Sequence, residues 1–252
     1  MMQGVFTVTK ASSPAAGFYD FTIHCPEMAR QAVPGQFLHI LCGEKTLRRP
    51  ISICEIDAES LRIVFEVRGE GTAILAQVRA GDTLDILGPC GNGFPKAAGK
   101  RALVIGGGIG TPPLLAAAKE AASADAILGF RNAGAVILAD DFRAACAQTF
   151  VTTDDGSHGE KGFVTDVLAR LAETERYDVI YACGPMVMLR KIARIAAGKQ
   201  IECYVSLEER MGCGVGACLV CACAIQRAAG ETSYLHVCKD GPVFPAKEVV
   251  FA

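Results

Sequence analysis

A short stretch of the sequence, residues 208–225 (EERMGCGVGACLVCACAI), concentrates four cysteines within eleven positions. The chain has twelve cysteines among 252 residues, a density too low for a small scaffold held by disulfides. Cysteines that stand apart are predicted to be small buried apolar residues in a reducing compartment. They include Cys25, Cys42, Cys54 and Cys146. The grouped cysteines need another explanation, because such spacing favours a shared ligand.

Four thiols have the spacing C-x4-C-x2-C-x16-C: Cys213, Cys218, Cys221 and Cys238. This spacing resembles that of plant-type ferredoxins, in which three close thiolates and one distant thiolate bind a 2Fe–2S cluster. Gly214 and Gly216 allow the sharp turns that a loop around a cluster needs. The backbone N–H groups of such a loop can point at the sulfurs. The sequence therefore predicts a 2Fe–2S site with these four ligands.

A zinc ion bound by four cysteines is the main alternative. Structural zinc sites usually use two short Cys-x2–4-Cys knuckles, and here the second knuckle is missing. Cys223 is a fifth candidate ligand, but Cys238 lies in its own stretch, HVCKDGPVF, and is the better distant ligand. A zinc-stabilised, non-catalytic binding module stays open as a hypothesis of another class.

Residues 1–98 contain short stretches of alternating apolar and polar positions, such as Leu61, Ile63, Phe65 and Val67. Alternation of this kind indicates half-buried strands. Six stretches follow one another, with turn residues between them: GVFTVTK, FYDFTIHC, QFLHILC, PISICEI, LRIVFEVR and DTLDILGP. Several short strands at close spacing predict a small antiparallel barrel.

Residues 99–202 alternate between strands and helices. RALVIGG, DAILGF, QTFVTTDD and YDVIYACG are apolar strands, whereas FVTDVLARLAE and PMVMLRKIARIAA have helical spacing. A further helix is predicted over TPPLLAAAKEAA, with Thr111 as its N-cap and Pro112 in its first turn. This alternation predicts a parallel sheet with helices on both faces.

Residues 203–252 are rich in cysteine, irregular, and too few for a large core of their own. We expect something other than hydrophobic burial to stabilise them. The predicted fold class is a multidomain α+β protein. It has an antiparallel barrel over 1–98, an α/β domain with a parallel sheet over 99–202, and a small cysteine-rich domain over 203–252.

RRPISI, residues 48–53, begins a predicted strand in the barrel segment. Arg49 can pair with a phosphate, and the Ser52 hydroxyl can hydrogen-bond the edge of a flavin ring. An exposed arginine before an ordinary strand is the alternative. GEGT, residues 69–72, opens the helix-like TAILAQV. Two glycines and a threonine at a helix start favour binding of a pyrophosphate.

VIGGGIGTPP, residues 104–113, is a glycine-rich turn between a predicted strand and a predicted helix. Gly106, Gly108 and Gly110 suit a phosphate-bearing ligand, but Pro112 stands near the usual third glycine of the dinucleotide fingerprint. A tight turn without a ligand is the alternative. In YACGPMVML, Cys183 and Gly184 end a strand where α/β sheets bind ligands, unless Cys183 is simply a packed core thiol.

Together, the R-P-x-S motif, the glycine-rich turn and the Cys-Gly-Pro stretch resemble the ferredoxin-reductase superfamily. In that superfamily the barrel holds a flavin and the α/β domain binds a nicotinamide nucleotide. SLEERMGCGVGACLVCAC, TTDDGSHGEKGFVTDVL and VCKDGPVF narrow the resemblance to the electron-transfer subunits of bacterial dihydroorotate dehydrogenase B, the NAD-linked type. This resemblance covers nearly the whole chain.

The resemblance implies where the cofactors bind. FAD contacts fall on Arg49, Pro50, Ile51, Ser52, Phe65, Glu66, Val67, Gly71 and Thr72. The 2Fe–2S ligands fall on Cys213, Cys218, Cys221 and Cys238. The nucleotide contacts stay those predicted from the glycine-rich turn and the strand end: Gly106, Gly108, Gly110, Cys183 and Gly184. Two departures are a slightly long last cysteine spacer and Glu66, where an aromatic or basic residue is expected.

The resemblance also implies a function: an oxidoreductase subunit that passes electrons from the FMN of a catalytic dihydroorotate dehydrogenase subunit to NAD+. The route runs through the 2Fe–2S cluster and FAD, in de novo pyrimidine (UMP) biosynthesis. No residue set looks like a dihydroorotate site with its own base, so we expect no catalytic residue here. The resemblance also implies a heterotetramer with two copies of each subunit. Electron-transfer subunits of a ferredoxin–NADP oxidoreductase or a sulfide dehydrogenase are the alternative.

Partners of other classes are not expected. The net charge is −2, and no basic run suggests nucleic acid or an anionic membrane surface. The first twenty residues lack the pattern of a signal peptide. Glycines and prolines interrupt the most apolar region, residues 102–118, which argues against a membrane span. We therefore expect a cytoplasmic location.

The choice between NAD and NADP stays open on the residues alone. Arg131 follows the strand AILGF and can meet a 2′-phosphate, and no acid stands in the expected ribose position. This local sign favours NADP, whereas the resemblance implies NAD.

Overall fold

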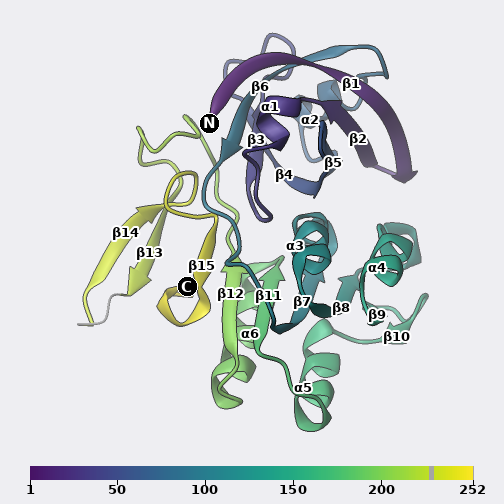
Figure 1. The fold of residues 1–252 in the computed structure, drawn as a ribbon, viewed down its shortest axis with the longest axis vertical. Coiled ribbons are helices and arrows are strands. Elements are labelled where there is room, and N and C mark those ends of the chain that lie inside the picture. The colour runs from purple at the N-terminus through teal and green to yellow at the C-terminus, as the bar shows by residue number, and fades with distance from the viewer. Residues whose placement is uncertain (227–229, 252) are drawn as a thin grey trace.

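The computed structural model describes residues 1–226 and 230–251. Its upper part in Figure 1 is a closed barrel with strand order β1-β2-β5-β4-β3-β6, in which every neighbouring pair is antiparallel. The strands are β1 (Met2–Ala15), β2 (Phe18–His24), β3 (Phe37–Ile40), β4 (Arg49–Ile56), β5 (Ser60–Glu66) and β6 (Thr83–Cys90). Two short helices, α1 (Pro26–Ala29) and α2 (Glu70–Leu75), connect them. The predicted antiparallel barrel is confirmed.

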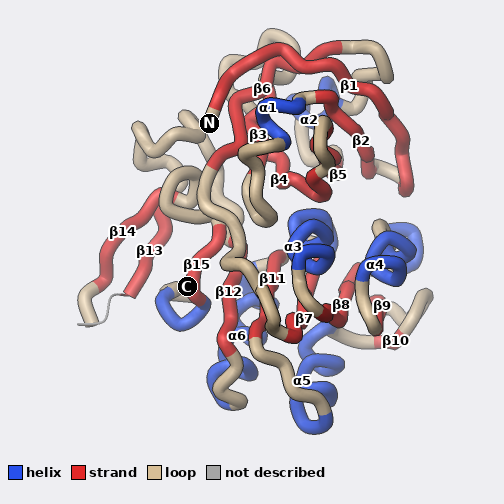
Figure 2. The backbone as a smooth tube through the Cα atoms, in the orientation of Figure 1, coloured by secondary structure: helices blue, strands red, loops and turns tan. Residues whose placement is uncertain are grey.

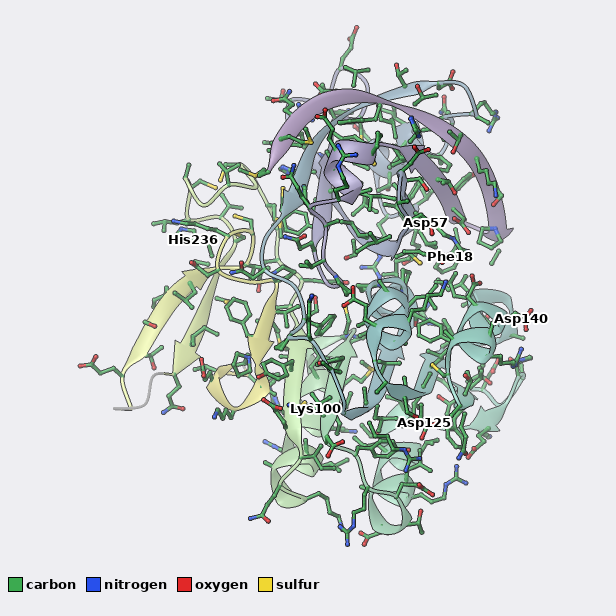
Figure 3. All side chains as sticks on the ribbon, in the orientation of Figure 1. Phe18, Asp57, Lys100, Asp125, Asp140 and His236 are labelled. Carbon is green, nitrogen blue, oxygen red and sulfur yellow. The ribbon has the colours of Figure 1, made fainter. Side chains whose placement is uncertain are left out.

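Successive residues of β5 point to opposite faces of the strand. Leu61, Ile63 and Phe65 pack inside the barrel, whereas Val64 packs against the α/β part of the molecule. Phe18 of β2 joins the same contact and lies where the barrel meets the helices below it (Figure 3). The isolated cysteines behave largely as predicted: Cys25, Cys42 and Cys54 are buried, and Cys146 is half-buried.

The lower part is a seven-stranded sheet with the order β10-β9-β8-β7-β11-β12-β15. Its strands are β7 (Arg101–Gly107), β8 (Ser123–Phe130), β9 (Gln148–Thr153), β10 (Glu160–Lys161), β11 (Val179–Cys183), β12 (Glu202–Ser206) and β15 (Val243–Pro245). All neighbouring pairs are parallel except β12 and β15, which are antiparallel. The predicted parallel sheet is therefore confirmed, and β15 adds an antiparallel edge.

Helices cover both faces of this sheet, as predicted (Figure 2). Ala102 and Val104 of β7 face α3 (Leu115–Glu120) and α4 (Ala139–Ala145), on the side of the barrel. Leu103 and Ile105 face α5 (Val164–Thr174) and α6 (Met186–Gly198) on the other side. Successive residues of a strand point to opposite faces, so a strand that is apolar at every position is buried on both faces. Among the described residues, no helix is long and apolar enough to cross a membrane.

The predicted N-cap at Thr111 is wrong. Two 3-10 turns, η1 (Gly108–Gly110) and η2 (Pro112–Leu114), precede α3, and Thr111 between them has helical angles of φ −68° and ψ −46°. An N-cap side chain accepts a bond from the N–H two or three positions later. Pro113 lacks that N–H, and the Thr111 hydroxyl makes no cap bond to the chain.

The segment after β12 forms a hairpin, β13 (Ala222–Gln226) and β14 (Thr232–His236), and then β15 and the 3-10 turn η4 (Ala246–Glu248). A further 3-10 turn, η3 (Ala133–Ala135), follows β8. The chain leaves the sheet at Ser206 and returns at Val243, which pairs with Ser206. Ile225, Val237 and Phe244 pack into the core under α5 and α6. Burial against the sheet therefore contributes to the stability of this segment. That something besides hydrophobic burial stabilises it stays a prediction, as do the domain boundaries at 98/99 and 202/203.

Candidate functional site

A cleft of about 210 Å³ lies between the barrel and the sheet. Seven predicted cofactor residues line it: Pro50, Ile51, Ser52, Phe65, Glu66, Thr72 and Cys183. The barrel side comes from β4, β5 and α2, and Cys183 stands at the end of β11 on the opposite side. Cys183 is also packed in the core, and its burial raises the pKa of its thiol. The fold therefore brings together residues that are more than 100 positions apart in the sequence.

The other predicted flavin residues, Arg49, Val67 and Gly71, lie outside the lining of this cleft. The guanidinium of Arg49 lies against Gly71, where a Cβ atom would come within 2.4 Å of Nε. The Thr72 hydroxyl accepts backbone hydrogen bonds from Arg68 (2.9 Å) and Gly69 (3.2 Å). Only glycine allows this close approach, which leaves a cation beside small residues and fits the diphosphate of a flavin nucleotide.

A second cavity, of about 720 Å³, opens at the carboxyl ends of the parallel strands. Gly108, Gly110 and Gly184 line it, but Gly106 does not. A Cβ atom on Gly106 would come within 2.7 Å of the Thr111 hydroxyl, so Gly106 allows the turn to pack on its strand. Gly108 has a φ of +54° and open space around it, which lets a ligand approach the backbone. This is the edge at which doubly wound sheets bind nucleotides.

Arg131 and Asp154 both line the second cavity. The backbone N–H of Asp154 donates to the carbonyl of Phe130 over 3.0 Å, which holds the ends of β8 and β9 together. The sequence reading missed Asp154 because it looked for an acid after the strand that precedes Arg131. The acid instead follows the neighbouring strand, in the TTDD stretch. The cavity therefore presents both a cation and a carboxylate to the ribose of a nucleotide.

The two cavities share four lining residues: Glu66, Arg68, Ile109 and Glu208. Arg68 Nε donates to Glu66 Oε2 over 2.8 Å, and its Nη1 lies 4.0 Å from Glu208 Oε2. Partial burial raises the pKa of Glu208, and the neighbouring Glu66 carboxylate adds to this effect, against the cation of Arg68. The sequence reading did not single out Arg68, Ile109 or Glu208, although two acids stand directly before the cysteine loop.

The four predicted ligands are gathered in the cysteine loop, residues 211–221, and the turn that follows β14 near His236 (Figure 3). Cys213 Sγ accepts N–H bonds from Val215 (3.4 Å) and Ala217 (3.2 Å). Cys238 Sγ accepts one from Gly216 (3.2 Å). Although burial raises the pKa of Cys213, the hydrogen bonds outweigh it and lower this pKa to about 6. Backbone donors thus already point at sulfur, as a site for thiolates requires.

The thiols form two pairs. Cys218 Sγ lies 3.4 Å from Cys213 Sγ, and Cys221 hydrogen-bonds Cys238, whose pKa is raised to about 12 by burial and by this bond. Among the described residues, no three His, Cys, Asp or Glu side chains converge as a single metal ion requires. A 2Fe–2S cluster takes two protein ligands on each of its irons, and two pairs fit it. Cys223 lies on β13, outside both pairs, and its pKa is raised to about 11 by burial.

The predicted sharp turns at Gly214 and Gly216 are confirmed by φ angles of +72° and +79°. A Cβ atom on Gly214 would come within 2.4 Å of Nδ1 of His39, a residue of β3 that the sequence reading did not single out. Burial lowers the pKa of His39 to about 4, and the cations of Arg48 and Arg49 add to this effect. The cysteine loop therefore packs directly on the barrel.

Comparison with known proteins agrees with this arrangement. Residues 208–250 match the family model described as the iron–sulfur cluster binding domain of dihydroorotate dehydrogenase B. The electron transfer subunit of dihydroorotate dehydrogenase B (NAD(+)) from Bacillus caldolyticus is 46% identical over 256 residues, covering 97% of each chain. The protein of the same name from Geobacillus sp. (strain WCH70) is 42% identical over 262 residues, covering 99% of each.

Among solved structures, an NADH-dependent reduced ferredoxin-NADP oxidoreductase has a TM-score of 0.87 and 31% identity, covering 98% of this chain and 90% of the other. A ferredoxin reductase of carbazole 1,9a-dioxygenase shares the fold, with a TM-score of 0.66 and 21% identity, covering 79% of this chain and 66% of the other. These matches favour an iron–sulfur protein over the zinc alternative. The chain belongs to the family of dihydroorotate dehydrogenase B electron transfer subunits, an oxidoreductase family built on the ferredoxin-reductase fold.

Proposed function

We propose that this chain is the electron-transfer subunit of an NAD+-dependent dihydroorotate dehydrogenase that serves pyrimidine (UMP) biosynthesis, and that it carries FAD and a 2Fe–2S cluster. The observation that carries the proposal is the continuity of the two cavities, which share Glu66, Arg68, Ile109 and Glu208. When bound, a flavin exchanges hydride with a nicotinamide and single electrons with an iron–sulfur cluster, as transfer between an FMN-containing partner and NAD+ requires.

The residues of this chain bind and orient these groups. We assign the flavin to Arg49, Pro50, Ile51, Ser52, Phe65, Glu66, Val67, Gly71 and Thr72. We assign the nicotinamide nucleotide to Gly106, Gly108, Gly110, Cys183 and Gly184, and the cluster to Cys213, Cys218, Cys221 and Cys238. Phe37, Val64 and Phe65 give the first cleft a buried apolar wall. The division into segments 1–98, 99–202 and 203–252 follows the same assignment.

Dihydroorotate is oxidised, in this proposal, on an FMN-containing catalytic subunit, with two copies of each subunit in the complex. Exposed apolar side chains of the cysteine loop and of the following hairpin support a partner there: Leu219 is 76% exposed, Val220 56%, and Tyr234 of β14 71%. Exposed apolar residues gathered in one region are typical of interaction sites. None of the twelve cysteines, all of them among the described residues, forms a disulfide, which supports the cytoplasm as the location.

The test is to purify the chain anaerobically, alone and co-expressed with the catalytic subunit. The chain should bind flavin, iron and acid-labile sulfide, and it should oxidise NADH with an artificial acceptor. Only the complex should reduce NAD+ with dihydroorotate, at a higher rate than NADP+. A chain that oxidises dihydroorotate unaided, or one that binds neither iron nor sulfide, would contradict the proposal.

A second candidate is favoured by one observation, the TM-score of 0.87 with an NADH-dependent reduced ferredoxin-NADP oxidoreductase. In that case the same carriers would serve another partner. Offering reduced ferredoxin and dihydroorotate to the native complex, in separate assays, distinguishes the two.

A further inference from the structure

His39 is a buried polar side chain whose ring makes no hydrogen bond of normal geometry among the described residues. It is 1% exposed, and neither Nδ1 nor Nε2 is satisfied there, although the backbone of Arg48 lies close enough to oppose the lowering of its pKa. Its Nδ1 edge faces Gly214, which follows the predicted ligand Cys213. The His39 backbone carbonyl does have a partner, since it accepts a bond from Arg48 Nη1 over 3.3 Å. The need for a partner is therefore confined to the imidazole ring.

A buried imidazole ring destabilises the protein unless its nitrogens have hydrogen-bond partners. A buried polar group without a partner costs about 1–3 kcal/mol, and native structures seldom leave one. A neutral imidazole has one N–H donor and one acceptor nitrogen. The ring lies against the cysteine loop, where a loaded site adds sulfur acceptors to the four thiolates. The missing partner is thus best supplied from that side.

We propose that His39 is a positioning residue for the cluster, and that its ring donates an N–H hydrogen bond to a sulfur atom of the loaded 2Fe–2S site. The inference rests on the proposed function, because it needs the cluster to be bound. It extends that function by making the barrel, and not the cysteine loop alone, part of the cluster environment.

The position of His39 on β3 gives this bond a consequence for electron transfer. Phe37, two residues earlier on the same strand, lines the first cleft, and its ring lies 6.4 Å from the imidazole in an edge arrangement. One strand therefore contacts the flavin cleft and the cysteine loop. A hydrogen bond to sulfur stabilises the extra negative charge of a reduced cluster, so it raises the reduction potential.

The test uses the wild-type holoprotein labelled with 15N-histidine, reduced and measured by pulsed EPR. The chain has four histidines, and His236 stands two residues before the proposed ligand Cys238, so the coupling that belongs to His39 is the one that vanishes in His39→Leu. The midpoint potential of His39→Leu should shift to a more negative value. His39→Asn keeps an N–H donor and should restore part of the shift. His24→Leu, on an exposed position of β2, is the matched control and should change neither signal nor potential.

Loaded wild-type protein without a histidine coupling would overturn the inference, and so would an unchanged potential in His39→Leu. If His39→Leu fails to bind iron, His39→Asn takes its place: the histidine coupling of the wild type should vanish in this variant, in which His236 is still present. Iron and sulfide analysis of the wild type separates this result from a failure of the proposed function, which would leave no cluster to measure.

Discussion

Glycine is required at position 214 for two separate reasons. Its φ of +72° is left-handed, and a Cβ atom would lie 2.4 Å from His39 Nδ1. Gly17, in the turn between β1 and β2, has a similar φ of +81° but nothing within 4 Å of its Cβ position. Substitutions at these two positions therefore distinguish the cost of a left-handed backbone from the cost of a collision with another side chain.

We expect Gly17→Ala to lower the free energy of unfolding by about 1–2 kcal/mol, the usual penalty of a left-handed residue. Gly214→Ala should lower it further, because the imidazole or the loop must also move. Chemical unfolding followed by circular dichroism measures both variants. Equal losses would mean that the loop does not pack on His39.

The two thiol pairs lead to a prediction about the cluster ligands. Cys218→Ser should lose most of its bound iron and acid-labile sulfide, because a serine hydroxyl is a poor substitute for a thiolate. Cys223→Ser should keep both, since Cys223 lies outside the pairs. Metal and sulfide analysis checks this. Loss of iron from Cys223→Ser with retention in Cys238→Ser would instead identify Cys223 as the distant ligand.

At the scale of elements, one arginine connects the barrel to the helices of the sheet. Arg62 of β5 donates to Asp20 of β2 (2.7 Å), Glu55 of β4 (3.2 Å) and Asp141 of α4 (2.5 Å). Lys119 of α3 also donates to Glu55. These partly buried ion pairs are the polar counterpart of the apolar contact made by Val64 and Phe18. They hold the barrel on helices α3 and α4 of the sheet.

This network predicts a loss of stability in acid. Burial raises the pKa of Glu55, but Lys119 and Arg62 outweigh it and leave this pKa below the usual 4.5. A carboxyl whose pKa is lowered by folding stabilises the protein above about pH 4.5, and this contribution is lost as the pH falls through the folded value.

Glu55→Gln should therefore lower the free energy of unfolding by about 1 kcal/mol at pH 7 and by less below pH 4. Thermal unfolding of both proteins across this pH range measures the difference. Glu173→Gln is the matched control, because Glu173 pairs with Lys199 on the exposed surface. A constant difference between wild type and Glu55→Gln at all pH values would contradict the prediction.

Local patterns in the sequence predicted most of the elements. Alternation located all six barrel strands, and apolar runs located β7, β8, β9 and β11, because these features depend on neighbours in the sequence. The start of α3 was missed because residues 112–114 form a 3-10 turn, in which Pro113 lacks one of the N–H groups that a capping threonine can bond. The cysteine ligands stand close together in the sequence and were found by spacing, although their role is still a proposal.

Other features depend on contacts between distant segments, which local patterns do not contain. β15 is only three residues long, and its partner β12 lies almost forty positions earlier. Arg68, Glu208 and Asp154 line the cavities only because separate strands end at one place. His39 reads as an ordinary strand residue until Gly214 packs against it.

At the scale of the whole molecule, the exposed apolar residues around the cysteine loop predict where the catalytic subunit binds. Leu219→Ser and Tyr234→Ser should each weaken binding to that subunit, by about tenfold if they remove about 1.4 kcal/mol. Val5→Ser is the matched control, because Val5 is equally exposed but lies on β1 of the barrel.

Titration calorimetry with the purified catalytic subunit measures these affinities. Oxidation of NADH with an artificial acceptor should stay unchanged in all three variants, since none of these residues lines either cavity. Unaltered affinity in both Leu219→Ser and Tyr234→Ser would place the interface elsewhere.

The pairing of Ser206 with Val243 has a consequence for how such proteins diversify. The residues between them form a segment that begins and ends at paired positions on neighbouring strands. A segment of another length or composition can be exchanged at these junctions while the strands themselves keep their register. The arrangement suits recombination, by which an ancestral reductase acquires a new electron-transfer segment. It also gives protein engineers two natural splice points.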